Sequence, residues 1–324
     1  MSKKKISVVM ATYNGEKYIL EQLDSLRDQT YVPDEVIICD DCSTDNTLAL
    51  LKKYIKNNNM KNWKVEQNIN NIGWKKTFWN LLQQAKNEFI FLSDQDDIWD
   101  SNKLMFMRDW MLKYINIDLL ASDYSPFYSN GNKLSSKVSF QKAKIKKLQF
   151  QDNFLKVTRP GCSFVIRKKL VTESNDLWTQ NQPHDFTLWN AALLSGKAYL
   201  VDQSLISWRI HNGSADFSKK YSMLSLILHP VQKSLELLDK KIPFIDFHIS
   251  FLSNCMSCIN ISFYNEISLH YLLFTIRKQY LISHDITLFF KTIMRYYRCY
   301  TIKTILMDLY CLISLKFSKK FLSN

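Results

Sequence analysis

Three aspartates stand close together directly after a short apolar run. Asp94, Asp96 and Asp97 follow residues 89–92 (FIFL), whose continuous apolar character is typical of a strand buried on both faces. Carboxylates this close repel one another, and a divalent cation would offset the repulsion. Mg²⁺ or Mn²⁺ held by one or two carboxylates, with phosphates completing the ligand set, fits this spacing. The competing interpretation is helix capping, which suits the following Asp100 but leaves Asp94 and Asp96 unexplained.

Polar or aromatic residues also follow two other apolar runs. Residues 6–11 lead into Tyr13, whose ring can stack on a base, and residues 35–39 lead into Asp40 and Asp41. Adjacent carboxylates can accept hydrogen bonds from a pyrimidine N–H or from ribose hydroxyls. Each feature alone is more often structural than functional. The first run lacks the G-x-G-x-x-G pattern, which argues against a dinucleotide-binding Rossmann domain.

The positioning of these residues requires a scaffold that gathers strand ends. Strand-like runs at residues 6–11, 35–39 and 89–92, with a short one around Val65, alternate with helical patterns such as residues 78–85. This alternation predicts an α/β fold with a mostly parallel sheet and helices on both of its faces. Ligands of such sheets bind at the carboxyl ends of the strands, which is where the polar residues fall.

Glycine usage and charge divide the chain. All six glycines lie in the first 213 of 324 residues, and the rest has apolar residues at helical spacing. We therefore expect an α/β domain over residues 1–215 and a basic helical subdomain over residues 216–324. Of the formal charge of +13, a surplus of 8 comes from Phe217 onward, where 14 Lys and Arg face 6 Asp and Glu. The helices either present a solvated basic face or lie on an anionic membrane leaflet.

The overall composition limits the class of protein and its cellular compartment. Apolar residues make up 46% and charged residues 23%, which excludes a disordered chain. The seven cysteines are expected to be free thiols that bind no metal, and the lysine-rich start predicts a cytoplasmic protein without a signal segment. The longest uncharged run of the final third, residues 247–265, is too polar to span a bilayer.

The ordered motifs VVMATYNGEKYI, EVIICDDCSTDNT, N-x-G and FIFLSDQDDIW resemble the family 2 glycosyltransferases of the GT-A fold. Over residues 5–212 the chain is most similar to the bacterial rhamnosyltransferase-like members that assemble surface polysaccharides. The resemblance implies a nucleotide-sugar site at Ala11, Tyr13, Asp40, Asp41, Asn71, Gly73, Asp94 and Arg209. It also implies a DxD metal site at Asp94 and Asp96, with Asp96 as the direct ligand and His211 as a ligand of the metal or of a phosphate.

The same resemblance implies that Asp185, in the segment QPHDF, is the catalytic base. Inverting transfer needs one carboxylate to take the proton of the acceptor hydroxyl, while a metal stabilises the departing diphosphate. Taken alone, Asp185 would more often cap a helix and His211 would more often be structural. The pairing of Arg209 with the diphosphate is less strongly indicated than the role of His211.

The expected function is therefore an inverting, Mn²⁺- or Mg²⁺-dependent glycosyltransferase. It would move a sugar from a UDP- or dTDP-sugar to a hydroxyl of a growing, lipid-linked cell-surface glycan, at the inner face of the plasma membrane. The alternatives are a non-catalytic protein that binds a polyanion or a membrane, and a hydrolase that uses the aspartate cluster. Nucleic acid is not expected as a partner, because much of the basic excess lies far along the chain from the acidic residues.

Overall fold

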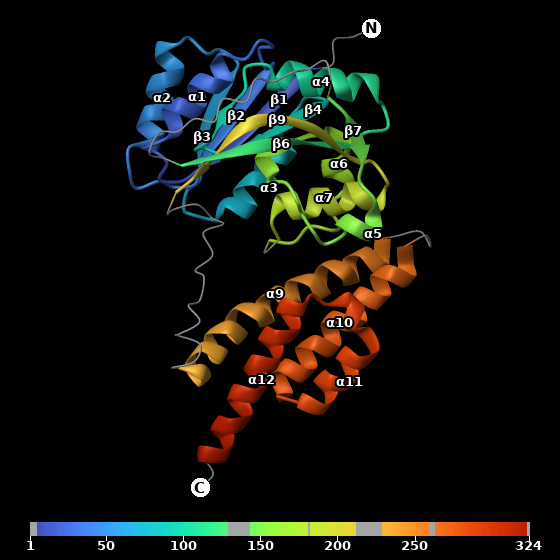
Figure 1. The fold of residues 1–324 in the computed structure, drawn as a ribbon. Helices are drawn as coiled ribbons and strands as arrows, with labels where there is room; N and C mark the ends of the chain where they lie inside the picture. The colour runs from blue at the N-terminus through green and yellow to red at the C-terminus, as the bar shows by residue number, and fades with distance from the viewer. Residues whose placement is uncertain (1–4, 129–142, 181, 212–228, 259–262, 323–324) are drawn as a thin grey trace. The chain divides into compact units, whose positions relative to one another are not determined.

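The computed structural model describes residues 5–128, 143–180, 182–211, 229–258 and 263–322, with side chains up to residue 316 (Figure 1). The chain divides into two compact units, Met1–Phe217 and Ser218–Asn324. The boundary that we predict at residue 215 lies outside the described residues. Each unit has its own hydrophobic core.

The first unit is built on one mixed sheet, with nine strands among the described residues in the order β3-β2-β1-β4-β8-β6-β9-β5 and with β7 paired to β9. The first four strands of that order are parallel, while β8 runs antiparallel to both β4 and β6. The strands are β1 (Ile6–Thr12), β2 (Glu35–Asp40), β3 (Trp63–Gln67), β4 (Phe89–Ser93), β5 (Ile98–Trp99), β6 (Leu119–Tyr128), β7 (Ile145–Lys147), β8 (Phe164–Arg167) and β9 (Ala198–Ile210).

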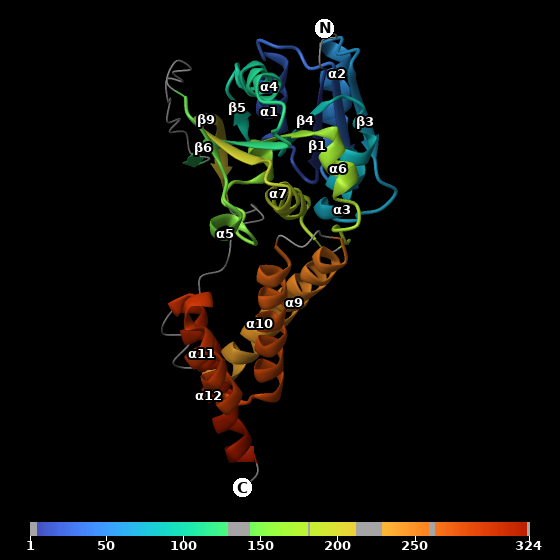
Figure 2. The same ribbon diagram turned by 90° about the vertical axis from the view of Figure 1, so that its right-hand side faces the viewer.

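Helices cover both faces of this sheet, with α1, α2 and α4 on one side and α3, α6 and α7 on the other (Figures 1 and 2). The helical elements of the unit are α1 (Ile19–Arg27), α2 (Thr47–Asn57), α3 (Trp74–Gln84), α4 (Lys103–Lys113), α5 (Phe150–Asn153), the 3₁₀ turn η2 (Gly161–Ser163), α6 (Lys168–Glu173) and α7 (His184–Leu194). The predicted α/β class is thereby confirmed, as are the four strands expected near residues 6, 35, 65 and 89.

Burial and register bring the polar strand ends together. Every residue of β1 and β4 is buried, as expected for strands covered on both faces. Thr12 lies opposite Asp40 on β2, and Met10 lies opposite Ser93 on β4. The segments that follow β1, β2 and β4 therefore leave the sheet at the same edge.

The second unit is helical and consists of α9 (Pro230–Cys258), α10 (Tyr264–Ser283), α11 (Ile286–Tyr296), the 3₁₀ turn η4 (Tyr297–Cys299) and α12 (Ile302–Leu322). Its core contains Ile245, Tyr280, Leu281, Phe289 and Leu312, which come from all four α-helices. The predicted helical character of this part is confirmed. No helix in the described part of the chain is both long and apolar enough to cross a membrane.

Candidate active site

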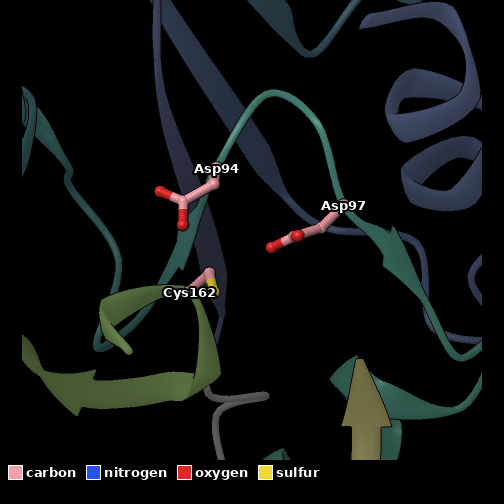
Figure 3. Close-up of side chains that lie close together, drawn as sticks. All are labelled: Asp94, Asp97 and Cys162. Carbon is pink, nitrogen blue, oxygen red and sulfur yellow. The ribbon is translucent and has the colours of Figure 1, made fainter. Parts of the chain in front are cut away.

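Residues 94–97 connect β4 to β5 and form the centre of the site. A carboxylate oxygen of Asp94, one of Asp97 and the sulfur of Cys162 all lie within 4.8 Å of one another. Figure 3 shows Asp94 and Asp97 at opposite ends of the loop, with the Asp97 carboxylate pointing toward Asp94 and Cys162 and one Asp94 oxygen directed toward Cys162 on η2. The strand-to-strand connection thus gathers three donor groups around one point.

Burial and mutual repulsion make the charged forms of these carboxylates unfavourable. Burial, reinforced by the neighbouring carboxylates, raises the pKa of Asp94 well above its ordinary value. Burial together with Asp96 raises the pKa of Asp97 to about 7. The Oδ2 atom of Asp97 is buried without a hydrogen-bond partner among the described residues. Such an atom costs free energy unless a ligand satisfies it, so a divalent cation fits this position.

The chemistry of the donors favours a hard cation. Carboxylate oxygens are the ligands that Mg²⁺ and Mn²⁺ prefer. Burial raises the pKa of the Cys162 thiol well above its ordinary value, and a thiol binds metal only as a thiolate. Asp94 and Asp97 therefore suit a hard metal ion, whereas Cys162 is a buried neutral neighbour.

Asp96 and His211 form a second pair in the same region. The Nε2 atom of His211 lies 2.7 Å from Oδ2 of Asp96, and the His211 ring lies 4.9 Å from that of Tyr18. The structure therefore brings the two together, as the resemblance implied, while the cluster of three donor groups uses Asp97 in place of Asp96.

Arg209 on β9 holds residues 94–97, the acidic loop, in place through hydrogen bonds. Its main-chain N–H donates to Oδ1 of Asp97 (3.1 Å), and its Nε donates to the carbonyl oxygen of Asp96 (2.7 Å). Its Nη2 donates to Glu21 (3.0 Å), and the guanidinium lies 4.5 Å from the ring centroids of both Tyr18 and Phe127. This buried guanidinium is engaged with the protein itself.

Gln95 joins the acidic loop to the segment after β1. Its side-chain oxygen accepts the N–H of Tyr13 at 2.9 Å, and its side-chain nitrogen donates to the Tyr13 carbonyl at 3.0 Å. A Cβ at Gly15 would come within 2.4 Å of the Gln95 Oε1 atom, so a larger residue at this position would displace the Gln95 amide. The Tyr13 ring itself is 45% exposed and is available to a ligand.

Asp40 and Asp41 hold the loops around the strand ends. Asp40 is buried and accepts hydrogen bonds from the hydroxyl of Thr12 and from both the N–H and the hydroxyl of Ser43. Asp41 accepts the N–H groups of Ile72 (2.9 Å) and Gly73 (2.8 Å). Both carboxylates are satisfied by the loops that they shape.

The remaining residues of the expected nucleotide site lie before α3 and in β1. The side chain of Asn71 accepts the N–H of Gly73 at 3.1 Å. Gly73 has a φ of 85° directly before α3, a conformation that glycine adopts without strain. Ala11 is buried within β1.

Asp185 lies in the first turn of α7, beside η2. Its Oδ1 accepts the N–H of Phe186 at 2.8 Å. A Cβ added at Gly161 would come within 3.0 Å of the Cβ of Asp185. Burial raises the pKa of Asp185, and its charge contributes to the raised pKa of Asp94. The structure thus places Asp185 in the electrostatic environment of the acidic loop.

Two buried residues beside the site were missed in the sequence. His184 stacks on Phe78 with ring centroids 4.1 Å apart, and burial lowers its pKa to about 3. The Lys103 ammonium donates to the carbonyl of Cys162 and lies 3.5 Å from the Trp99 ring centroid. His184 adjoins Asp185, which is a signal in hindsight, but nothing in the local pattern separates Lys103 from a surface lysine.

Comparison with known proteins identifies the family. A family model described as Glycosyl transferase family 2 matches residues 7–174. The chain is 30% identical over 237 residues to the dTDP-rhamnosyl transferase RfbG of Shigella flexneri, covering 67% of this chain and 78% of that protein. It is 28% identical over 217 residues to the UDP-Glc:alpha-D-GlcNAc-diphosphoundecaprenol beta-1,3-glucosyltransferase WfgD of Escherichia coli, covering 66% and 80% of the two chains.

The fold comparison agrees. The crystal structure of Staphylococcus aureus TarS 1-349 in complex with UDP-GlcNAc matches with a TM-score of 0.56 and 22% identity, covering 98% of this chain and 92% of that one. The fold and the rhamnosyltransferase-like resemblance expected from the motifs are both confirmed. This chain belongs to glycosyl transferase family 2 and has the GT-A fold.

Proposed function

We propose that this glycosyltransferase moves a sugar, with inversion, from a UDP- or dTDP-sugar to a hydroxyl of a growing, lipid-linked cell-surface glycan. Two relatives support these substrate classes. RfbG is a dTDP-rhamnosyl transferase, and WfgD is a glucosyltransferase that takes UDP-Glc as donor and a diphosphoundecaprenol-linked GlcNAc as acceptor. The observation that carries the proposal is the close pair of the half-buried Asp94 and the buried Asp97. Oδ2 of Asp97 has no hydrogen-bond partner among the described residues, and the charge of Asp185 acts on Asp94. We propose that the reaction takes place at the inner face of the plasma membrane, where a lipid-linked acceptor would be presented.

Asp94 and Asp97 would hold the cation, Mn²⁺ or Mg²⁺, with Asp96 and His211 as the further ligands that we propose. When bound, such an ion offsets the negative charge of the donor diphosphate. Arg209 holds the loop in shape by bonding Asp96 and Asp97, so we assign it a positioning role in the donor site.

The nucleotide would lie across the loops after β1 and β2. The exposed ring of Tyr13 can stack on a pyrimidine base. Asp41 fixes the loop that carries Asn71 and Gly73, and Asp40 fixes the loop that carries Ser43. Ala11 lies near the end of the buried strand β1. These residues, with Asp94, form the proposed donor site.

Asp185 is the proposed base of a single displacement. Its carboxylate takes the proton of the acceptor hydroxyl, the acceptor oxygen bonds to C1 of the sugar, and the bond from C1 to the diphosphate breaks. Asp185→Asn should lower kcat by about 10²–10⁴-fold and leave donor affinity unchanged, as measured by calorimetry beside initial rates. Equal losses of affinity and rate would make Asp185 a binding or structural residue.

Donor hydrolysis measured against a panel of nucleotide-sugars tests the function as a whole. We expect turnover of UDP- or dTDP-sugars with Mn²⁺ or Mg²⁺ and none with chelator. Asp97→Asn should abolish it, whereas Asp109→Asn, which alters an exposed carboxylate on α4, should not. Failure with every donor, together with thermal stabilisation by oligonucleotide alone, would favour the non-catalytic alternative.

A further inference from the structure

Helix α11, continued by η4, divides its exposed surface into two adjacent stripes. One is apolar and the other basic. In each, the two members on α11 follow the i, i+4 spacing that lines up side chains along an α-helix, and the third lies in η4 directly after it. The apolar stripe is Phe290, Met294 and Tyr297, and the basic stripe is Lys291, Arg295 and Arg298. Met294, in the middle of the apolar stripe, is 82% exposed.

The core fixes which side of α11 faces outward. Phe289 and Thr292 are buried, and the Phe289 ring packs edge-on against Tyr280 of α10 at 5.4 Å. The helix cannot rotate its stripes inward without removing Phe289 from the core. The exposure of Met294 is therefore a property of the packed unit.

The start of α12 continues the same chemistry. Ile302 is 77% exposed, Leu306 is also exposed, and the exposed Lys303 lies between them in sequence. Residues 286–307 contain four basic residues and no Asp or Glu. Within the described part of the chain, none of the four forms an ion pair with a carboxylate.

We propose that α11 and the first turns of α12 dock on an anionic phospholipid bilayer. The apolar stripe inserts at the boundary between headgroups and acyl chains, and the basic stripe contacts lipid phosphates. This inference rests on the proposed function, because a lipid-linked acceptor is presented at such a surface.

The combination of stripes selects a bilayer over other occupants. A nucleic acid would pair with the basic stripe but would leave Met294 and Ile302 in water. A second copy of the chain, meeting the same face about a two-fold axis, would place basic stripes near one another. A bilayer with anionic headgroups accepts both stripes at once, since its phosphates and acyl chains are adjacent layers.

Three further lysines, Lys316, Lys319 and Lys320, lie near the end of the chain. Only Lys316 is described with its side chain, and it is exposed. The other two lie outside the described side chains. The stripes of α11 supply basic and apolar contact together, which a cluster of lysines alone does not.

Vesicle flotation of the full chain tests the proposal, with phosphatidylglycerol–phosphatidylcholine vesicles and pure phosphatidylcholine vesicles at low and high salt. Binding should require the anionic lipid and weaken with salt. The triple variant Lys291→Gln/Arg295→Gln/Arg298→Gln should lose about 100-fold in partitioning, at about fivefold per charge. The matched control Lys52→Gln/Lys53→Gln/Lys56→Gln removes three exposed charges from α2 and should lose far less.

The apolar stripe has its own pair of variants. Met294→Ser changes a side chain that makes little contact with the core and should weaken binding to anionic vesicles severalfold. Leu235→Ser, on α9 and 50% exposed, should not. Thermal melts by circular dichroism check that each variant is folded.

Three outcomes would overturn the inference. They are binding to neither vesicle, equal binding by the stripe variants and their controls, and a stripe-dependent dimer or oligonucleotide complex in place of vesicle binding. Donor hydrolysis on the same preparations without vesicles separates this result from a failure of the proposed function.

Discussion

At the scale of single residues, Gln95 lies between two acidic residues of the site, yet its side chain bonds both main-chain groups of Tyr13. Each such hydrogen bond contributes about 0.5–1.5 kcal/mol to stability. Together they tie the segment after β1, which contains Tyr13, to the acidic loop. We expect Gln95→Ala to raise the KM for the nucleotide-sugar about tenfold while kcat changes less.

The side-chain chemistry of Gln95 supplies a sharper comparison. Gln95→Glu keeps the acceptor oxygen but has no N–H for the Tyr13 carbonyl, so it should not restore the KM. Gln83→Ala is the matched control, since the Gln83 side chain on α3 donates a hydrogen bond to Asn175 (2.8 Å). An unchanged KM in Gln95→Ala would show that the two loops are held together by other contacts.

At the scale of elements, His184 fastens α7 to α3 by stacking on Phe78 and meeting the edge of Trp74. Burial holds its pKa at about 3, below the value of about 6.5 in an unfolded chain. The unfolded state therefore binds a proton first as the pH falls below about 6.5, and stability is lost from there down to about pH 3.

For this one group the loss between about pH 7.5 and pH 5 should be about 2 kcal/mol. Urea unfolding followed by tryptophan fluorescence measures it, because all eight tryptophans lie in the first 208 residues. His184→Gln should flatten this part of the pH dependence, whereas the exposed His229→Gln should keep the wild-type slope. Equal slopes in all three proteins would contradict the assignment.

Asp308 ties three helices of the second unit together. On α12, it accepts hydrogen bonds from Lys241 of α9 and from Arg277 and Tyr280 of α10 at 2.5–3.0 Å. Burial alone would raise the pKa of Asp308, but its bonds to Arg277 and the charges of Arg277 and Lys241 outweigh burial and lower it. This contribution to stability is present above about pH 4 and is lost as the pH falls through the lowered value.

Asp308→Asn leaves two partly buried cations without their counter-charge, and it should cost the second unit about 3–5 kcal/mol of unfolding free energy. Urea unfolding followed by far-UV circular dichroism measures this loss. Asp246→Asn, which breaks an exposed pair with Lys278, should cost only about 0–1 kcal/mol. A similar cost in the two variants would mean that the Asp308 network contributes little net stability.

At the scale of the whole molecule, the proposed chemistry ends before the second unit begins. Every site residue lies at or before His211, and the core of the first unit is formed by residues up to Trp208. We therefore expect residues 1–217, expressed alone, to unfold cooperatively and to retain cation-dependent donor hydrolysis. Loss of hydrolysis in a folded fragment would show that the second unit contributes to the donor site.

Some parts of the site could be predicted from the sequence because they depend on local order. Buried parallel strands need continuous apolar runs, and their polar ends must share an edge, so the positions of Asp41, Asp94 and the Tyr13 segment followed from residues 6–11, 35–39 and 89–92. The gap in glycine usage likewise predicted the helical second unit.

The sequence by itself determined the family, the α/β class and the acidic loop, since each is written in motifs only a few residues long. The tertiary structure alone decided the roles within that loop: β9 returns more than a hundred residues later to place Arg209 against Asp97, and η2 brings Cys162 beside it. It also decided the burial of Lys103 and the outward face of α11. These properties arise from contacts between distant segments, and local periodicity carries no information about which distant segment will cover a given side chain.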